Sequence, residues 1–165
     1  MLARVRVLLT GMSGVGKSSL VQELRRRGQL AFDADDDGFS APRADGRWGW
    51  NVERVAELLG SETASPLFFA GCSEEQIELP FDYRVLLTAP EHVLVERLGT
   101  RTNNPYGRDG AELSQVLRDR AEVEPLLRRS ADLVLTTTAP PGELADSLLA
   151  RVADVLSARR TRTAQ

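Results

Sequence analysis

The stretch Gly11-Met12-Ser13-Gly14-Val15-Gly16-Lys17-Ser18 decides the fold of this 165-residue chain. It fits the phosphate-binding loop pattern G-x-x-x-x-G-K-[ST] at every fixed position. Glycines let consecutive backbone N–H groups turn inward around phosphate oxygens, while the lysine and the hydroxyl supply a cation and a Mg²⁺ ligand. Lys17 is the single lysine among 21 basic residues, so the one ammonium group stands where this loop chemistry requires it.

The segments on both sides of the loop support that interpretation. Residues 5–10 read as a buried strand, and residues 19–24 as an amphipathic helix. Strand, loop and helix in this order are the context that the motif requires, and such a helix points the positive end of its dipole at the anion. We therefore expect ATP phosphates to bind at Gly11, Ser13, Gly14, Val15, Gly16, Lys17, Ser18 and Ser19.

Size and composition favour one soluble domain over residues 1–165, with 42% hydrophobic residues. No apolar run is long enough to span a bilayer and no secretory signal opens the chain, so we expect no membrane contact. The net charge of −3 gives no basic field for nucleic acid. Cys72 is the single cysteine, which excludes an intrachain disulfide and a cysteine-based zinc site. We expect a cytoplasmic monomer or homodimer.

Strand and helix patterns alternate along the chain, which predicts an α/β fold. Right-handed crossovers then give a parallel sheet with helices on both faces. Pro125 should kink or divide the fourth helix, and the polar tail 157–165 should fray. The predicted strands are 5–10, 30–33, 66–71, 83–88 and 132–136, and the predicted helices are 17–27, 52–59, 91–99, 111–128 and 142–156.

Two long connections, 35–50 and 100–110, carry no regular pattern. In open α/β folds ligands bind beyond the carboxyl ends of the strands, where long loops form lids and substrate walls. We expect residues 35–60 to form an acceptor-binding region and residues 100–110 to form a lid.

A D-x-D pattern, Asp33 and Asp35, ends the second strand. If the strand persists, the alternation of side chains puts both carboxylates on one face, pointing toward the phosphate-binding loop. Carboxylates at that place can hold the water shell of a metal ion and accept a hydroxyl proton. Asp36 and Asp37 are typical of a solvated acidic turn. The same stretch spells D-x-x-G, but a single lysine leaves no N-K-x-D guanine motif, which argues against a GTPase.

Arginines mark both long connections. Arg97 and Arg101 are four residues apart on a helical pattern, and Arg108 follows in the second connection. A lid arginine can stabilise charge on a transferring phosphoryl group, although cations near a helix C-terminus are favourable without any ligand. In the first connection, tryptophans lie beside arginines that can pair with a carboxylate or phosphate, and they form either a substrate wall or a small satellite core. The candidate residues there are Arg43, Arg47, Trp48 and Trp50.

The loop, the D-x-D and the arginine-bearing lid together resemble the small P-loop kinases, a group that includes shikimate kinase, gluconate kinase and adenylate-kinase-like enzymes. The resemblance implies a three-layer fold with a five-stranded sheet of order 2-3-1-4-5. It also implies that Asp33 lies near Mg²⁺, which Ser18 helps to hold, that Asp35 meets the acceptor, and that Arg101 is a lid arginine. Gly71 corresponds to the glycine-rich end of the third strand, where shikimate kinase has a longer glycine run.

The chain departs from these kinases at the acceptor side. It has no Gly-Gly-Gly run after the third strand, no His-Pro after the second and no acid at the end of residues 66–71. We therefore expect a phosphotransferase that moves the γ-phosphoryl of Mg·ATP to a small soluble acceptor, either a hydroxyl metabolite such as a sugar acid or a nucleoside monophosphate. Lys17, Asp35 and Arg101 would carry the chemistry. The alternative is a nucleotide-binding regulatory or scaffold module with little turnover, and the acidic balance disfavours a polynucleotide kinase.

Overall fold

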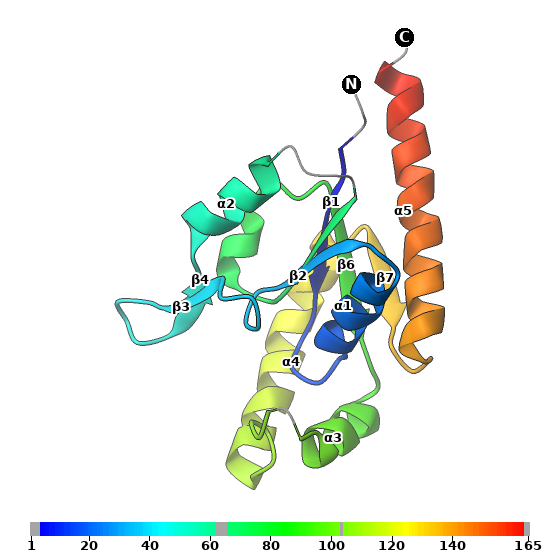
Figure 1. Cartoon of the computed structure of the whole chain (residues 1–165). Coiled ribbons are helices and arrows are strands. Elements are labelled where there is room, and N and C mark those ends of the chain that lie inside the picture. Colours follow the sequence, from blue (N-terminus) through cyan, green and yellow to red (C-terminus); the bar gives the residue numbers. More distant parts are fainter. Residues whose placement is uncertain (1–3, 62–65, 103, 164–165) are drawn as a thin grey trace.

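The computed structural model has three layers, with a β-sheet between two layers of helices (Figure 1). It describes residues 4–61, 66–102 and 104–163. Some expectations fall on residues outside these ranges, namely residues 1–3 of the expected domain, residue 103 of the expected lid and residues 164–165 of the expected tail.

Within the described residues, five strands form one parallel sheet of order β2-β5-β1-β6-β7. Counted along the chain this order is 2-3-1-4-5, so the predicted fold class is confirmed. The strands are β1 (Arg6–Thr10), β2 (Leu30–Asp33), β5 (Leu67–Ala70), β6 (Tyr83–Thr88) and β7 (Leu133–Thr136).

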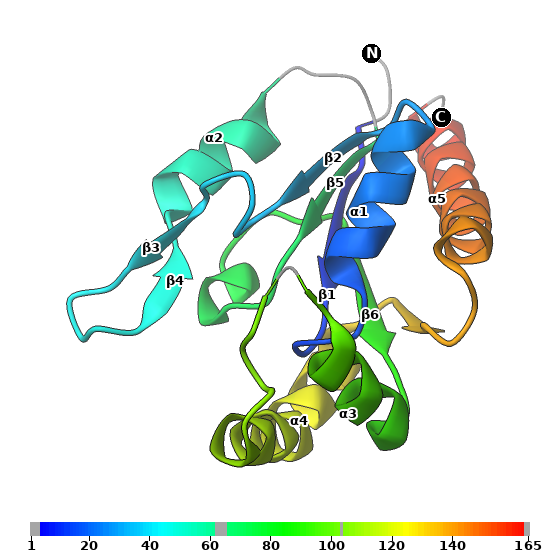
Figure 2. The ribbon, with the colours of Figure 1, turned by 60° about the horizontal axis from the view of Figure 1, so that its bottom comes forward.

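The helices cover both faces of this sheet, because the central strands are apolar on both sides. Val7 and Leu9 of β1 pack with α1 and α5, whereas Leu8 packs on the opposite face with Trp50 and the helix α2. Figure 2 shows α1 and α5 side by side, and both helices contribute to the same core cluster. The helices are α1 (Lys17–Arg26), α2 (Val52–Gly60), α3 (Glu91–Thr100), α4 (Gly110–Ser130) and α5 (Pro141–Thr163), with a short 3-10 helix η1 (Glu74–Ile77).

The first long connection contains structure that the sequence pattern did not predict. Strands β3 (Ser40–Pro42) and β4 (Trp48–Trp50) pair as an antiparallel hairpin that projects from the sheet (Figure 2). Its turn is closed by the bond from the Arg43 N–H to the Arg47 carbonyl at 2.6 Å, with Gly46 at φ 80°. Asp45-Gly46 is a common hairpin-turn dipeptide, so the signal was present but each strand is too short to show alternation.

Two further expectations need correction. The expected division of the fourth helix is not seen, because α4 continues through Pro125 with the buried side chains of Glu124 and Leu127 on both sides of the proline. The helix α5 continues to Thr163 instead of fraying from residue 157. Arg159 anchors this last part, since its guanidinium donates to Asp82 Oδ1 at 3.0 Å and to the Arg4 carbonyl at 3.2 Å.

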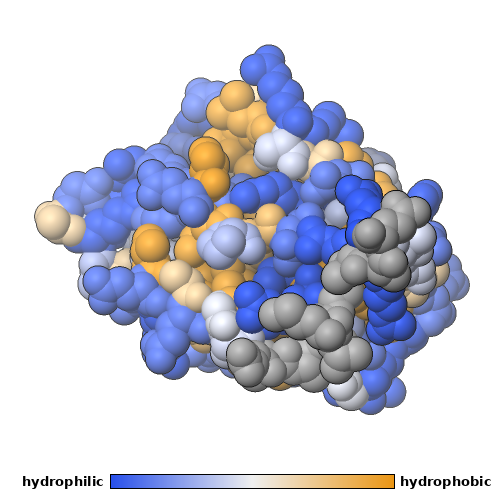
Figure 3. Space-filling view, turned by 90° about the horizontal axis from the view of Figure 1, so that it is seen from above, coloured by the Kyte–Doolittle hydropathy of each residue, from blue (hydrophilic) through white to orange (hydrophobic). Residues whose placement is uncertain are grey.

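The amino ends of the strands, seen in Figure 3, present a mainly hydrophilic surface with hydrophobic residues in patches between the polar ones. No helix in the described ranges is both long enough and apolar enough to cross a membrane.

Candidate functional site

A cavity of about 980 Å³ opens at the carboxyl ends of the strands. Its walls come from the loop after β1, the turn after β2, the strand β4, the residues after β5, and the end of α3. Three predicted site residues lie outside its lining, namely Arg43, Arg47 and Arg108. The predicted residues that line it are Gly11, Ser13, Gly14, Val15, Gly16, Lys17, Ser18, Ser19, Asp33, Asp35, Trp48, Gly71, Arg97 and Arg101.

The phosphate-binding loop owes its shape to glycine. Gly11, Gly14 and Gly16 have φ values of 152°, 85° and 98°, in the region that side chains disfavour. A Cβ atom at Gly11 would also lie 2.4 Å from the Leu87 carbonyl oxygen, so no other residue fits there without moving β6. Gly16 is the N-cap residue of α1, and the helix therefore starts with backbone N–H groups at the wall of the cavity.

The Lys17 ammonium group braces this loop from within. Its Nζ donates to the carbonyl oxygens of Gly11 at 2.6 Å and Met12 at 3.0 Å. Burial lowers the pKa of Lys17 below its ordinary value, against the nearby charges of Cys72, Asp33 and Asp35, which raise it. A group that is desolvated and close to carboxylates is typical of functional sites.

The loop and the second strand meet through one short hydrogen bond. The Ser18 hydroxyl donates to Asp33 Oδ2 at 2.7 Å. Asp33 is buried, and its other oxygen accepts the backbone N–H groups of Asp35 at 3.0 Å and Asp36 at 3.3 Å. The carboxylate of Asp33 is thus fixed in direction from both sides.

Asp35 lines the same cavity, but not for the reason that the pattern suggested. The strand β2 ends at Asp33, so Asp35 lies in the following turn and strand alternation does not place it. Its side chain is exposed, and Oδ1 accepts the Ser40 hydroxyl at 2.6 Å. The two carboxylates of the D-x-D line one cavity because of the turn that follows β2, and not because of the alternation of side chains along a strand.

Arg97 supports the loop from behind. Its guanidinium donates to the Thr137 hydroxyl at 3.0 Å, to the Thr137 carbonyl, and more weakly to the carbonyls of Val15 at 3.3 Å and Gly14 at 3.4 Å. Thr137 is itself buried and donates to the Val15 carbonyl at 2.6 Å. Arg97 therefore fastens the loop to the segment after β7.

The other two arginines separate at the end of α3. Arg101 is the C-cap residue, lines the cavity, and donates to the Tyr106 carbonyl at 2.5 Å. Its buried Nε has no hydrogen-bond partner within the described part of the chain, and burial lowers the pKa of this guanidinium. Arg108 is exposed and donates to the Arg101 carbonyl, so it fixes the loop that follows α3 from outside the cavity.

The predicted acceptor residues also divide into two groups. Arg43 forms an ion pair with Glu75, and Arg47 pairs with Asp45 at 2.9 Å. Trp48 is 70% exposed and lines the cavity, whereas Trp50 is buried against Phe69 with ring centroids 5.1 Å apart. Trp50 thus belongs to the core and also lines the cavity, whereas Trp48 contributes an exposed indole to the cavity wall.

The donors in this cavity suit a nucleotide phosphate and Mg²⁺. Turned glycine N–H groups and a helix N-terminus are an anion site, and the hydroxyl–carboxylate pair of Ser18 and Asp33 offers the hard oxygens that Mg²⁺ prefers. The described residues hold no cluster of three or more His, Cys, Asp or Glu side chains with metal-ligand geometry. Mg²⁺ often uses one or two protein ligands together with phosphates and water, so the sparse set fits.

A family model described as "AAA domain" matches residues 7–118. The chain belongs to the AAA domain family. Among curated relatives of this AAA domain is a nucleotide-binding protein of Caldicellulosiruptor saccharolyticus, which is 27% identical over 94% of this chain and 54% of the relative. Another, from Paramagnetospirillum magneticum, is 30% identical over 83% of this chain and 46% of the relative. The AAA domain described here spans about half the length of the curated relatives it matches.

Solved structures place the fold of this AAA domain with the small P-loop kinases. A shikimate kinase from Acinetobacter baumannii, in complex with shikimate, superposes with a TM-score of 0.66 at 18% identity, over 93% of this chain and 95% of the kinase. A gluconokinase from Sinorhizobium meliloti superposes with a TM-score of 0.62 at 21% identity, over 96% of this chain and 97% of the gluconokinase. At these identities the likeness concerns the fold alone.

Sequence reasoning missed the supporting residues of the AAA domain site. Its patterns assign no role to Thr137, Ser40 or Glu75. Ser40 orients Asp35, and Glu75 neutralises Arg43. The only available signal was the Asp45-Gly46 turn, which brings Ser40 opposite Trp50 and so near the cavity.

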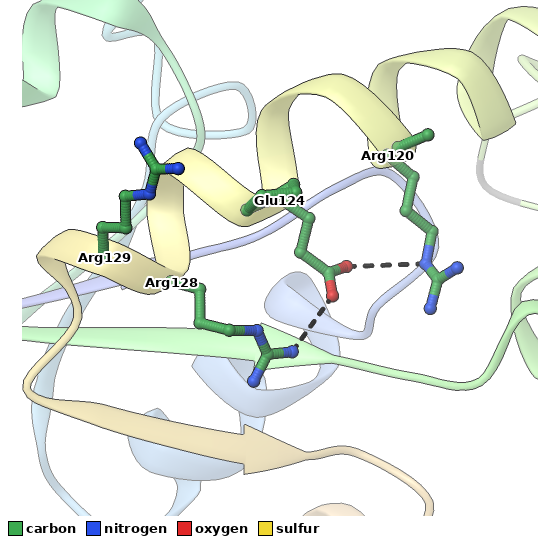
Figure 4. Close-up of a pocket in the computed structure, with 6 residues that line it drawn as sticks. Arg120, Glu124, Arg128 and Arg129 are labelled. Carbon is green, nitrogen blue, oxygen red and sulfur yellow. Dashed lines mark hydrogen bonds and ion pairs between the residues drawn. The ribbon is translucent and has the colours of Figure 1, made fainter.

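A second cavity of about 550 Å³ lies against α4, and Figure 4 shows the side chains that line it. Arg120 and Arg128 reach toward the buried Glu124 at 3.5 and 3.2 Å, while Arg129 points away. Glu124 accepts the Thr88 hydroxyl at 3.0 Å. These contacts tie α4 to the end of β6, and no predicted site residue of the AAA domain lies among them.

Proposed function

We propose that this protein is an ATP-dependent phosphotransferase that moves the γ-phosphoryl group of Mg·ATP to a hydroxyl or phosphate oxygen of a small soluble acceptor. The observation that carries the proposal is the 2.7 Å bond between Ser18 and Asp33, which joins a hydroxyl of the phosphate-binding loop to a buried carboxylate beside Asp35. A site that only binds a nucleotide does not need a second acid next to the γ-phosphoryl position.

The roles follow from the contacts. Ser18 and Asp33 would hold Mg²⁺, which supplies charge neutralisation on the phosphates when it is bound. The loop N–H groups and Lys17 bind the phosphate oxygens, for which Lys17 exchanges its contacts to Gly11 and Met12. Arg101 stabilises charge on the transferring group. In the reaction a bond forms between the acceptor oxygen and the γ-phosphorus, the bond to the β–γ bridging oxygen breaks, and Asp35 takes the acceptor's hydroxyl proton.

Residues 35–60 form the acceptor side and residues 100–110 the lid in this proposal, within one domain. Asp35, Trp48 and Gly71 meet the acceptor, because they line the cavity on the side away from α3. Arg43 and Arg47 act on the acceptor only indirectly, because Arg43 joins the hairpin to Glu75 of η1 and Arg47 pairs with Asp45 in the hairpin turn.

A nucleotide-binding module with little turnover is the second candidate. The names of the curated relatives support it, since those proteins are called nucleotide-binding proteins and are about twice as long as this chain. In that case the nucleotide state of this domain would be passed to another segment, and Asp35 would have no acceptor to deprotonate.

The deciding experiment measures ADP release from Mg·ATP with a pool of small hydroxyl compounds and nucleoside monophosphates, alongside equilibrium ATP binding. We expect acceptor-dependent ADP release, a loss of about 10²-fold or more in Lys17→Ala, and a comparable loss in Asp35→Asn with ATP binding retained. Arg118→Ala on the exposed side of α4 is the matched control and should behave as wild type. Tight ATP binding without ADP release across the pool would instead support the binding module.

A further inference from the structure

The side of the cavity that faces the acceptor has an unusual charge composition. It is formed by the turn after β2, the strand β4 and the residues after β5, and we call it the acceptor end. Its lining includes two carboxylates, Asp35 and Asp36, and an exposed thiol, Cys72. Among the described residues, these three segments contribute no lysine, arginine or histidine to the cavity wall.

The two arginines that could have supplied a positive charge are turned to other partners. Arg43 pairs with Glu75, approaches Glu74 at 3.4 Å, and donates to the Ser73 hydroxyl at 3.3 Å. Burial raises the pKa of Glu75, but hydrogen bonds from Ser73, from its own backbone and from Arg43 hold it below its ordinary value. The Glu75 charge therefore stays in place to neutralise Arg43.

Arg47 is held in the same way at the tip of the hairpin. Its Nε donates to Asp45 Oδ2 at 2.9 Å, and Asp45 also accepts the Arg47 backbone N–H at 3.0 Å. Neither arginine lines the cavity, so an anionic group on the acceptor would find no arginine at this end, and Lys17, which lies near Cys72 and Asp35, is expected to engage the phosphates of ATP.

An aromatic wall takes the place of the cations. The buried ring of Trp50 fills the space beside Gly71, where an added Cβ would lie 2.8 Å from Trp50 Cζ2. Trp48, in the same strand, leaves most of its indole exposed at the cavity. The face of an exposed indole attracts cations and apolar ring faces and disfavours anions.

The acids at this end repel one another. Asp35 and Asp36 both line the cavity, and their backbone N–H groups donate to Oδ1 of Asp33 at 3.0 and 3.3 Å, so the three acidic residues are held close together. The cations on the rest of the wall, Lys17, Arg97 and Arg101, belong to the loop and α3, where the phosphates are expected. The acids of the wall thus lie on the turn after β2, whereas its arginines lie on α3 and at the C-cap of that helix.

We infer, on the basis of the proposed phosphotransferase function, that the acceptor is a hydroxyl compound without a phosphate or carboxylate group, either uncharged or positively charged, such as a polyol or an amino sugar. Asp35 takes its hydroxyl proton and Trp48 covers its apolar or cationic face. This excludes sugar acids and nucleoside monophosphates, the two acceptor classes expected from the sequence.

The sign of the field can be measured without any acceptor, because Cys72 is the single cysteine of the chain and lies exposed at the acceptor end. Two methanethiosulfonate reagents are used, one with a trimethylammonium group and one with a sulfonate group. The rate at which each reagent modifies Cys72 is divided by the rate at which the same reagent modifies 2-mercaptoethanol, and the two ratios are compared. We expect the cationic reagent to be favoured about tenfold at low salt, and the preference to shrink at 1 M salt. Asp36→Asn should reduce it, whereas Asp119→Asn on α4 should not. Equal rates, or a preference for the sulfonate, would overturn the inference.

A second measurement uses acceptors matched in shape. ADP release from Mg·ATP is compared for glucosamine, glucose, gluconate and glucose 6-phosphate, with Trp48→Ala beside Trp48→Phe. We expect kcat/KM at least tenfold higher for the neutral or cationic members, and a loss in Trp48→Ala that Trp48→Phe largely restores. Highest kcat/KM for an anionic member would refute the inference while leaving the phosphotransferase standing. If none of the four is turned over, the proposed function is in question, and the thiol rates alone decide the charge of the acceptor end.

Discussion

Replacing Arg97 with alanine tests whether this arginine holds the loop or touches the nucleotide. Its guanidinium has four protein acceptors in the described residues, two on Thr137 and two on the carbonyls of Gly14 and Val15. An arginine with this many protein partners has little capacity left for phosphate. We therefore expect Arg97→Ala to act first on stability and only through stability on turnover.

The size of the effect follows from the two shorter contacts. A hydrogen bond from a charged donor contributes about 1.5–3 kcal/mol, and the two bonds at 3.3 and 3.4 Å are too long to add much. Part of the guanidinium is solvated, so we take about 2–4 kcal/mol for the loss. In a chain of this length that corresponds to a fall in melting temperature of about 5–15 °C.

The assay is thermal unfolding followed by circular dichroism, with Arg101→Ala as the matched variant. Within the described residues, the Arg101 side chain makes one hydrogen bond, to the Tyr106 carbonyl, and its buried Nε has no partner, so its loss should leave the melting temperature within about 2 °C. Its effect should appear as a fall in acceptor-dependent ADP release of about 10²-fold. An unchanged melting temperature in Arg97→Ala, together with a large loss of ADP release, would refute this division of roles.

Two further substitutions probe the cavity wall. Gly71→Ala forces a methyl group to within 2.8 Å of Trp50 and 2.9 Å of the Ala34 Cβ, so we expect the free energy of unfolding, measured by chemical denaturation, to fall by about 1–3 kcal/mol. Gly99→Ala has open space around the new methyl group and should leave the free energy of unfolding unchanged. Equal effects of the two substitutions would contradict the packing argument. Asp36→Asn should raise the melting temperature at pH 7, because the raised pKa means that ionisation of Asp36 favours the unfolded chain as pH increases. That gain should disappear below the ordinary aspartate pKa of about 3.9, and a gain of the same size at pH 3 would show that charge is not its cause.

The phosphate-binding side of the site was predictable from the sequence, because its signals are local. The strand β1, the loop and α1 are consecutive, and Asp33 lies at the end of the next apolar run. The fixed spacing of glycines and Lys17 then leaves few arrangements. The correct order of the five described sheet strands followed from the resemblance that these residues carry.

The rest of the cavity depends on contacts between residues far apart in the chain. Arg43 meets Glu75 across 32 positions, and Arg97 meets Thr137 across 40. A sequence pattern shows that an arginine is present but not which carboxylate or carbonyl it reaches. The hairpin was missed for a different reason, since strands of three residues are too short for a period of two to emerge.

The hydrogen bond from Thr137 to the Val15 carbonyl has a practical consequence for the choice of truncated fragments of this protein. The similarity to the family model stops at residue 118, inside α4 and well before Thr137. A fragment trimmed to that boundary would keep every residue of the G-x-x-x-x-G-K-[ST] pattern but lose Thr137, which bonds the Val15 carbonyl of the loop. It would also lose Leu144, Leu148 and Val152 of α5, against which the helix carrying Lys17 is packed. The shortest fragment that we expect to fold by itself therefore includes the residues that support the loop and extends into α5.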